Sequence, residues 1–253
     1  MKISLCIPIY NEESILHDTV ETLSSYMQKT FVEDYEIIFI NDGSKDRSLE
    51  ILSSVAQKIK NIRVVTYDQN QGKGYAVRQG VLQSNGKIII FTDCDLAYGT
   101  DVIRQMFDMF EKYPSYDVII GSRKKHPEGY EGYTRIRKFV SHSYIRILSL
   151  IGGIKVSDFQ CGCKGFRAEI GKKIFEKCII NRFAFDIEVL TYAHDLNAGI
   201  GEMPVKIINH RNSTVHIVRD SIKILKDISI FKKHRQNEIK KKKENESKKK
   251  TDL

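Results

Sequence analysis

The sequence predicts an α/β fold in which a mostly parallel central sheet carries helices on both faces. Two observations support this prediction. Short runs rich in Ile and Val recur through the first half of the chain, and a helical pattern separates each run from the next. Continuous apolar runs are typical of strands buried on both faces, and their alternation with helices gives parallel pairing with right-handed connections. With 253 residues, of which 41% are apolar, the chain is long enough to bury a full core.

The individual elements of the first half follow from these runs. Each predicted strand is a block of mostly apolar residues, and each predicted helix fills the interval before the next block. The predicted strands are residues 2–10, 35–42, 62–68, 87–93 and 116–122. The predicted helices are residues 12–28, 45–59, 74–84 and 101–112.

The second half of the chain has a less regular pattern. It predicts a helix at 134–151, a short strand within CKGFR, a helix around 184–196, a strand near 200–208 and an amphipathic helix at 215–231. The chain is therefore expected to form one main domain over residues 1–214, followed by the amphipathic helix and by a Lys-rich tail over residues 232–253. The tail is expected to be disordered or a frayed helix.

The positive charge of the chain is concentrated in this tail. The net charge is +9, and residues 232–253 alone carry ten Lys or Arg against four acidic residues, so that only +3 remains for the rest. A basic tail without a basic face on the body argues against a nucleic-acid partner. We expect the tail to be attracted to an anionic membrane surface. A tail that only increases solubility remains the alternative.

The lack of a recognisable targeting signal and the cysteine pattern both favour an intracellular protein. No window approaches the roughly 20 consecutive apolar residues of a membrane-spanning helix, and the first residues lack the pattern of a signal peptide. The odd number of five cysteines, without CxxC spacing, argues against a disulfide framework or a zinc site. We expect reduced thiols and a cytoplasmic protein that associates peripherally with the inner face of the membrane.

Polar residues follow each predicted strand of the first half. Ligands of parallel sheets bind beyond the carboxyl ends of the strands, so these residues are expected to meet in one cleft. They are Tyr10, Asn11 and Glu12 after the first strand, Asn41 and Asp42 after the second, Asp68 after the third, Asp93 and Asp95 after the fourth, and Ser122 and Arg123 after the fifth.

The segment TDCDLA, residues 92–97, carries the most informative pattern. Asp93 and Asp95 lie one residue apart just past a strand, where two carboxylates can hold a hard divalent cation, Mg²⁺ or Mn²⁺, together with diphosphate oxygens. Asp42 in INDGS fits either a turn that caps the next helix or a contact to a nucleoside. We expect it to bond the nucleoside.

Four motifs, in this order and spacing, resemble the inverting family-two glycosyltransferases of the Rossmann-like GT-A fold. They are CIPIYNEE at 6–13, NDGS at 41–44, NQGKGYAVRQG at 70–80 and TDCDLA at 92–97. The resemblance covers about residues 1–220 and implies a metal-dependent hexosyltransferase whose partner is a nucleotide-sugar donor. It identifies residues 1–214 as a GT-A catalytic domain.

Four further segments are similar to one branch of that family, which moves a hexose onto a polyprenyl or dolichyl phosphate. They are GSRKK at 121–125, DFQCGCKGFR at 158–167, FDIEVL at 185–190 and EMPVKIINHRNSTV at 202–215. The pattern is most like the dolichyl-phosphate glucosyltransferase type. It implies transfer of glucose from UDP-glucose to a lipid-linked phosphate.

The resemblance also assigns roles to individual residues. Asp93 and Asp95 are expected to hold the metal and the diphosphate. Arg211 is a candidate for the charge that a Lys usually supplies in this family, because the corresponding element here reads Asn212, Ser213, Thr214. The predicted donor site comprises Pro8, Tyr10, Asn11, Glu12, Asp42, Asp68, Lys73 and Arg211. The predicted acceptor site comprises Arg123, Arg137, Ser141 and Arg167.

The acceptor decides whether a general base is needed. A phosphate monoester is already an anion and can attack the anomeric carbon without one. A hydroxyl acceptor would need a carboxylate base, for which Asp158 and Asp186 are the candidates. Either could instead be a buried salt-bridge partner of Arg167 or Lys164.

Other functions remain open at this point. Within the enzyme class they are a GDP-mannose-dependent polyprenyl-phosphate mannosyltransferase and a hydroxyl-acceptor family-two glycosyltransferase. Outside it they are a nucleotide-sugar or nucleic-acid binding module without activity. The presence of both Asp93 and Asp95 favours an enzyme.

Overall fold

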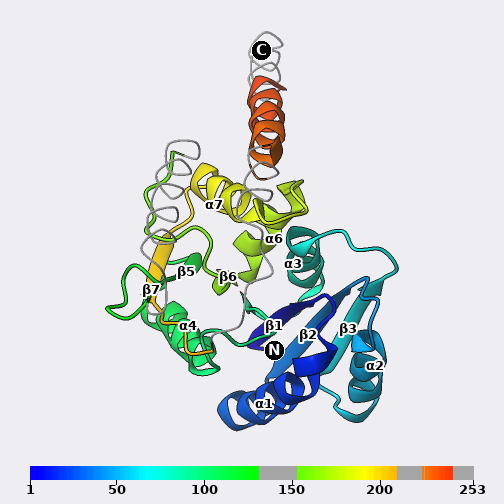
Figure 1. The fold of residues 1–253 in the computed structure, drawn as a ribbon. Helices are drawn as coiled ribbons and strands as arrows, with labels where there is room; N and C mark the ends of the chain where they lie inside the picture. Colours follow the sequence, from blue (N-terminus) through cyan, green and yellow to red (C-terminus); the bar gives the residue numbers. More distant parts are fainter. Residues whose placement is uncertain (131–152, 210–223, 225, 242–253) are drawn as a thin grey trace, which may run out of the picture.

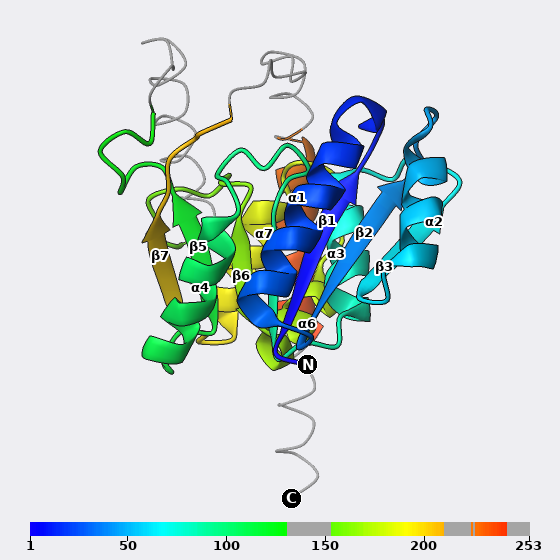
Figure 2. The same cartoon turned by 90° about the horizontal axis from the view of Figure 1, so that it is seen from below.

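The computed structural model describes residues 1–130, 153–209, 224 and 226–241. Its centre is a seven-stranded sheet with the strand order β3-β2-β1-β4-β6-β5-β7, covered by helices on both faces (Figures 1 and 2). This confirms the predicted α/β architecture. The helix predicted at 134–151 lies outside the described residues.

The first half forms the elements that the apolar runs predict, with small differences at their ends. The strand predicted at 87–93 is shorter, because the chain leaves the sheet after Phe91. It continues into residues 92–97, which we call the acidic loop. The elements are β1 (Ile3–Ile9), α1 (Glu13–Phe31), β2 (Tyr35–Asp42), α2 (Ser48–Lys58), β3 (Ile62–Tyr67), α3 (Lys73–Gln83), β4 (Ile88–Phe91), α4 (Asp101–Lys112) and β5 (Val118–Ser122).

The described part of residues 153–209 adds two strands to the same sheet and two helices beside it. They are β6 (Lys164–Arg167), α6 (Ala168–Lys177), α7 (Phe185–Asp195) and β7 (Ile200–Pro204). β6 lies between β4 and β5 and pairs antiparallel with both, whereas the other pairings in the sheet are parallel. The residue that opens β6, Lys164, is therefore paired with Phe91 at the carboxyl end of β4. The β6 strand thus begins at the edge where the parallel strands end.

The core lies in two layers, one on each face of the sheet. Helices α1, α2 and α4 bury their apolar sides on one face, through residues such as Leu23, Leu52 and Met106. Helices α3, α6 and α7 cover the other face, with Val77 and Phe175 among the buried residues. Figure 2 shows the two sets of helices in front of and behind the strands. All five cysteines are buried free thiols.

A last helix continues past the predicted end at residue 231, because residues 226–241 are helical. One side of this helix packs on α7, and its Phe231 is 2% exposed. Arg235 donates to Asp195 of α7 at 2.8 and 2.5 Å. The hydroxyl of Tyr192, also on α7, donates to Glu238 at 2.9 Å. Since these side chains recur every three or four residues, they share one face of a helix. Residues 232–241 are thus helical, which is one of the two states expected for the tail, and residues 242–253 lie outside the described part.

Within the described ranges, no helix combines the length and the apolar composition that crossing a bilayer requires.

Candidate active site

The loops after β1 and β2 are tied together at the carboxyl edge of the sheet. The backbone amide of Asn11 donates to the Ser44 hydroxyl at 3.0 Å. The backbone amide of Lys45 donates to the Asn11 side-chain oxygen at 2.7 Å. The Glu12 amide donates to the Ser48 hydroxyl at 3.0 Å. Asn11 takes a φ of 55°, a region that asparagine tolerates better than most residues. Its side chain therefore holds the two loops in place.

The other predicted donor residues of these strands lie at the same edge. Tyr10 is 45% exposed, Pro8 and Glu12 are half-buried, and the Asp68 residue is exposed. The Asp68 carbonyl accepts a bond from the Lys45 ammonium at 3.2 Å. The structure thus brings these residues to one rim, where their side chains border solvent.

Asp42 is buried and its carboxylate organises the loop that precedes α3. Its oxygens accept bonds from the Asn70 side chain at 2.7 Å, the Gln71 amide at 2.8 Å and the Gly72 amide at 2.9 Å. Gly72 has a φ of 104°, which favours glycine. The sequence predicted a contact between Asp42 and a nucleoside, whereas the structure shows a carboxylate already bound to this loop.

Lys73, the first residue of α3, lies beside the two acidic residues that follow β4. Its ammonium forms an ion pair with the Asp93 carboxylate. The Asp95 carboxylate accepts a bond from the Ala97 amide at 3.1 Å. Burial raises the pKa of Asp95, and the negative charge of Asp93 raises that pKa further. The structure therefore assembles Lys73, Asp93 and Asp95 into one charged cluster.

These residues fit a divalent cation. Two carboxylates that destabilise each other's charge attract a hard cation with oxygen ligands. Within the residues that the structure describes, no group of three His, Cys, Asp or Glu side chains could hold a metal by itself. Asp93 and Asp95 would therefore share the ion with oxygens of a bound ligand, as an open catalytic site requires.

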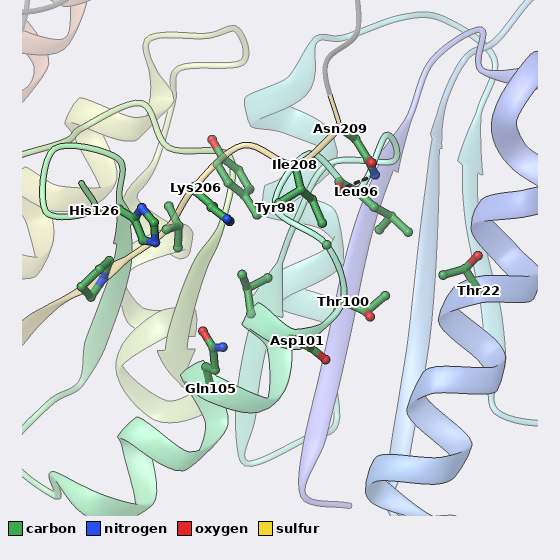
Figure 3. Close-up of a pocket in the computed structure, with 14 residues that line it drawn as sticks. Thr22, Leu96, Tyr98, Thr100, Asp101, Gln105, His126, Lys206, Ile208 and Asn209 are labelled. Atoms are coloured by element: carbon green, nitrogen blue, oxygen red, sulfur yellow. Dashed lines mark hydrogen bonds between the residues drawn. The ribbon is translucent and has the colours of Figure 1, made fainter. Parts of the chain in front are cut away.

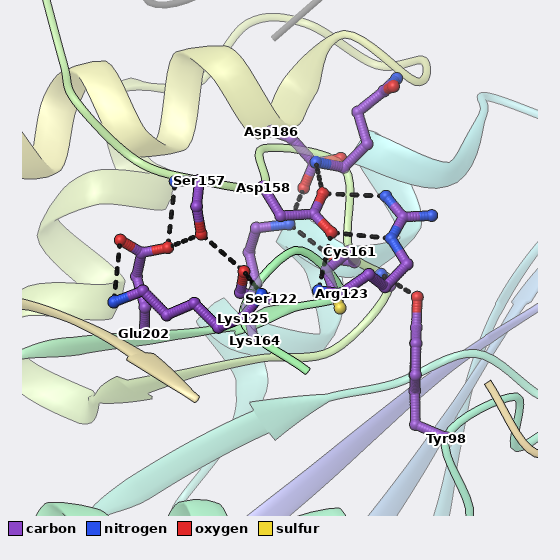
Figure 4. Close-up of polar contacts among 12 residues, drawn as sticks. Tyr98, Ser122, Arg123, Lys125, Ser157, Asp158, Cys161, Lys164, Asp186 and Glu202 are labelled. Carbon is purple, nitrogen blue, oxygen red and sulfur yellow. Dashed lines mark hydrogen bonds and ion pairs between the residues drawn. The ribbon is translucent and has the colours of Figure 1, made fainter. Parts of the chain in front are cut away.

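Asp186 adjoins the cluster from α7. Lys164 is fully buried, and its ammonium lies 2.6 Å from the Asp186 carboxylate and 2.8 Å from the Cys161 carbonyl. Burial raises the pKa of Asp186, and the charge of Lys164 lowers it in part. The salt bridge to Lys164 that the sequence left open is confirmed (Figure 4).

Arg123 and Asp158, predicted as an acceptor ligand and a general base, bind each other. The guanidinium donates to both carboxylate oxygens, at 2.7 and 2.8 Å, and the side chains are 12% and 1% exposed. Figure 4 shows this fork. Burial acts to raise the pKa of Asp158, but the hydrogen bonds and charge of Arg123 outweigh it and lower that pKa. Asp158 is therefore a poor proton acceptor, and the partner expected for it, Arg167 or Lys164, is replaced by Arg123.

Arg167 does not belong to the site. It ends β6, pairs with Ile88 at the start of β4, and donates to the Tyr116 and Phe110 carbonyls at 2.8 and 2.7 Å. Because β6 runs antiparallel to β4, Arg167 lies where the parallel strands begin, away from their carboxyl ends. The prediction of an acceptor contact is wrong for Arg167. The three other candidates Arg137, Ser141 and Arg211 lie outside the described residues.

A cavity of about 460 Å³ lies beside the acidic loop and was not predicted (Figure 3). The segment after β7 closes one side of it: the Asn209 amide group donates to the Asp95 and Leu96 carbonyls at 3.3 and 3.0 Å, and the Ile208 amide donates to the Ala97 carbonyl at 2.8 Å. These bonds fix the backbone that carries Asp95.

The fold is that of the GT-A glycosyltransferases. Among solved structures, glucosyl-3-phosphoglycerate synthase from Mycobacterium tuberculosis, crystallised with uridine diphosphate, superimposes with a TM-score of 0.66 over 91% of this chain and 79% of its own, at 18% identity. The chain belongs to the glycosyl transferase family 2, whose model matches residues 4–175.

Three relatives have a more specific name than the family does. The chain is 33% identical to the dolichyl-phosphate beta-glucosyltransferase of Dictyostelium discoideum, over 89% of this chain and 72% of the relative. It is 33% identical to an enzyme of that name from Trichomonas vaginalis, over 81% and 65%, and 30% identical to the human one, over 81% and 66%. The chain thus spans roughly two thirds of the length of these relatives.

Proposed function

We propose that the protein is an inverting glycosyltransferase that moves glucose from UDP-glucose onto a polyprenyl or dolichyl phosphate. The observation that carries the proposal is the cluster of Lys73, Asp93 and Asp95 at the end of β4. This arrangement can bind a diphosphate leaving group through one ammonium and one shared cation. The named activity of the relatives supports the choice of sugar and acceptor.

In this proposal Asp93 and Asp95 hold Mg²⁺ or Mn²⁺ against the donor diphosphate. The bound ion would neutralise negative charge on the leaving group, as metal ions do in phosphoryl and glycosyl chemistry. Lys73 adds a second positive charge at the same place. A structural neighbour has been crystallised with Mn²⁺ and uridine diphosphate, which supports this choice of ligands.

The nucleoside would lie on the rim formed by Pro8, Tyr10 and Glu12. Asp42 would then act on the donor through the loop that it holds, because its oxygens already accept bonds from Gln71 and Gly72. Asp42 would thus position the donor through this loop, in addition to the contact with the nucleoside that the sequence predicts.

The acceptor phosphate would approach from the side of Arg123. Asp158 fixes the orientation of this guanidinium through two bonds, and a guanidinium can offset the repulsion between two phosphate groups. Arg137 and Ser141 remain proposed partners of the acceptor. An anionic acceptor needs no general base. For a hydroxyl acceptor Asp186 is the remaining candidate base.

Donor identity can be tested by thermal unfolding with a panel of nucleotides. A ligand that binds only the folded protein raises the midpoint. With Mn²⁺ present, UDP-glucose and UDP are expected to raise the midpoint of unfolding more than GDP-mannose does, and EDTA should remove most of the shift. A larger shift with GDP-mannose would contradict the proposed donor and favour a mannosyltransferase.

We further propose that the protein acts in the cytoplasm, at the inner face of a membrane, where lysines of residues 232–253 contact anionic lipid. Lys232, Lys233, Lys240 and Lys241 on the last helix are exposed, and such charges attract anionic lipid with a strength that falls as salt rises.

Removal of residues 242–253 tests this contact and leaves the described helix intact. The truncated protein is expected to sediment less with vesicles containing phosphatidylserine at low salt, while its turnover on a detergent-soluble acceptor stays unchanged. Equal sedimentation of both proteins would show that these residues do not bind the membrane.

A further inference from the structure

Helix α7 carries a second buried carboxylate, Glu188, that the proposed chemistry does not use. Glu188 is 0% exposed. Its two oxygens accept bonds from the Ile179 and Ile180 amides, both at 2.8 Å. These two residues belong to the α6–α7 loop, by which we mean residues 178–184. Burial of a carboxylate is costly unless it is hydrogen-bonded, so this arrangement holds the loop in one conformation.

The α6–α7 loop in turn packs on the start of α3. The Asn181 carbonyl accepts a bond from the Tyr75 amide at 3.0 Å. A side chain added at Gly72 would lie 2.6 Å from the same carbonyl oxygen, and one added at Gly74 would lie 2.7 Å from the Ile180 carbonyl oxygen. The glycines of the QGKGY segment are therefore required by this close approach.

Arg78 fastens the loop from the α3 side. Its guanidinium donates to the Cys178 carbonyl at 2.6 Å and to the Asn181 side chain at 2.9 Å. It also lies over the Tyr75 ring, 5.0 Å from the centroid. The loop is thus fixed at its amides by Glu188 and at its oxygens by Arg78 and Tyr75.

The first turn of α3 is consequently held from two sides. On one side Asp42 accepts the Gln71 and Gly72 amides, and on the other the α6–α7 loop accepts the Tyr75 amide. Lys73, which pairs with Asp93, lies between these supports. A shift of the loop would move the ammonium of Lys73 relative to Asp93.

We propose that Glu188 is a positioning residue that fixes Lys73 at the diphosphate site through the α6–α7 loop. The inference rests on the proposed function for the identity of the ligand, a nucleoside diphosphate with a divalent cation. It predicts that Glu188 affects donor binding although its bonds to the protein lie outside the charged cluster. Burial raises the pKa of Glu188 to about 7, which agrees with a carboxylate enclosed by protein.

The test uses the full chain with Glu188→Gln, which keeps the size of the side chain but replaces one of its two acceptor oxygens by an amide group. Glu36→Gln is the matched control. Glu36 is also a buried carboxylate, accepts the Asn85 amide at 2.7 Å, and lies on β2 next to the start of β1, at the opposite edge of the sheet. Amide hydrogen exchange is measured without ligand, and affinity for UDP is measured by calorimetry with Mn²⁺.

In Glu188→Gln, exchange is expected to become faster at Ile179 and Ile180 and also at Tyr75, and UDP affinity is expected to fall by about 10-fold, as for other residues that orient a ligand-binding group. Arg78→Met should reproduce both effects. Glu36→Gln should change neither. Faster exchange confined to Ile179 and Ile180, or unchanged UDP affinity in Glu188→Gln, would overturn the inference, as would an equal loss of affinity in the control. If the wild type itself fails to bind UDP, the proposed donor is wrong, and the exchange at Tyr75 still decides the positioning role.

Discussion

Asp95→Asn is expected to lower the rate of sugar transfer by about 100-fold or more, because removing a charged ligand from a metal at the transition state costs several kcal/mol. Among the described residues, no cationic side chain is bonded to the Asp95 carboxylate, whereas Asp93 is paired with Lys73. A shared cation would be the main compensation for its charge. The measurement is initial-rate transfer from UDP-glucose at saturating Mg²⁺.

Removal of the metal should have the same consequence in the wild type. EDTA is expected to abolish transfer, and Mg²⁺ or Mn²⁺ should restore it. Asp101→Asn is the matched control, because Asp101 is an exposed carboxylate at the start of α4 and lies outside the cluster. Full activity in EDTA, or wild-type turnover by Asp95→Asn, would show that the leaving group is stabilised by other means.

Asp158→Asn is expected to destabilise the fold by about 3–5 kcal/mol, the usual cost of leaving one member of a buried ion pair without its counter-charge. The pair with Arg123 is almost completely enclosed. Urea unfolding at neutral pH measures the effect. In Asp108→Asn, which removes the carboxylate from an exposed pair with Arg104, the unfolding midpoint should stay close to the wild-type value.

The same pair predicts a pH dependence of stability. The pKa of Asp158 is lower in the folded protein than the ordinary value of about 3.9. The stabilisation is therefore complete above that ordinary value and is lost as the pH falls through the folded pKa. Asp158→Asn should be much less stable than the wild type at pH 7, and the difference should shrink on acidification. A difference that is constant down to low pH would mean that the charge of Asp158 does not stabilise the fold.

The fold could be predicted from the sequence because strands such as β1, β2 and β4 are buried on both faces and appear as mostly apolar runs. Their carboxyl ends meet at one edge by necessity, and Asp93 and Asp95 could be placed there for that reason. The helix α6 was missed, although its buried residues Gly171, Ile174 and Phe175 recur at helical spacing.

The rest of the site depends on contacts that no local pattern contains. A short strand such as CKGFR does not reveal its direction in the sequence, and the antiparallel direction of β6 separates Arg167 from the site. The pairing of Arg123 with Asp158 joins residues 35 positions apart. Glu188 was overlooked because its bonds depend on the conformation of the loop that it binds.

The product of a single reaction tests the central claim most directly. The full chain is incubated with UDP-glucose, Mg²⁺ and a short polyprenyl phosphate in detergent, with polyprenol as the parallel acceptor, and the lipid product is examined by mass spectrometry and NMR. The account predicts a β-linked glucosyl phosphodiester from the phosphate and no product from polyprenol. Glucose on the polyprenol hydroxyl, an α-linked product, or transfer from GDP-mannose in place of UDP-glucose would contradict it.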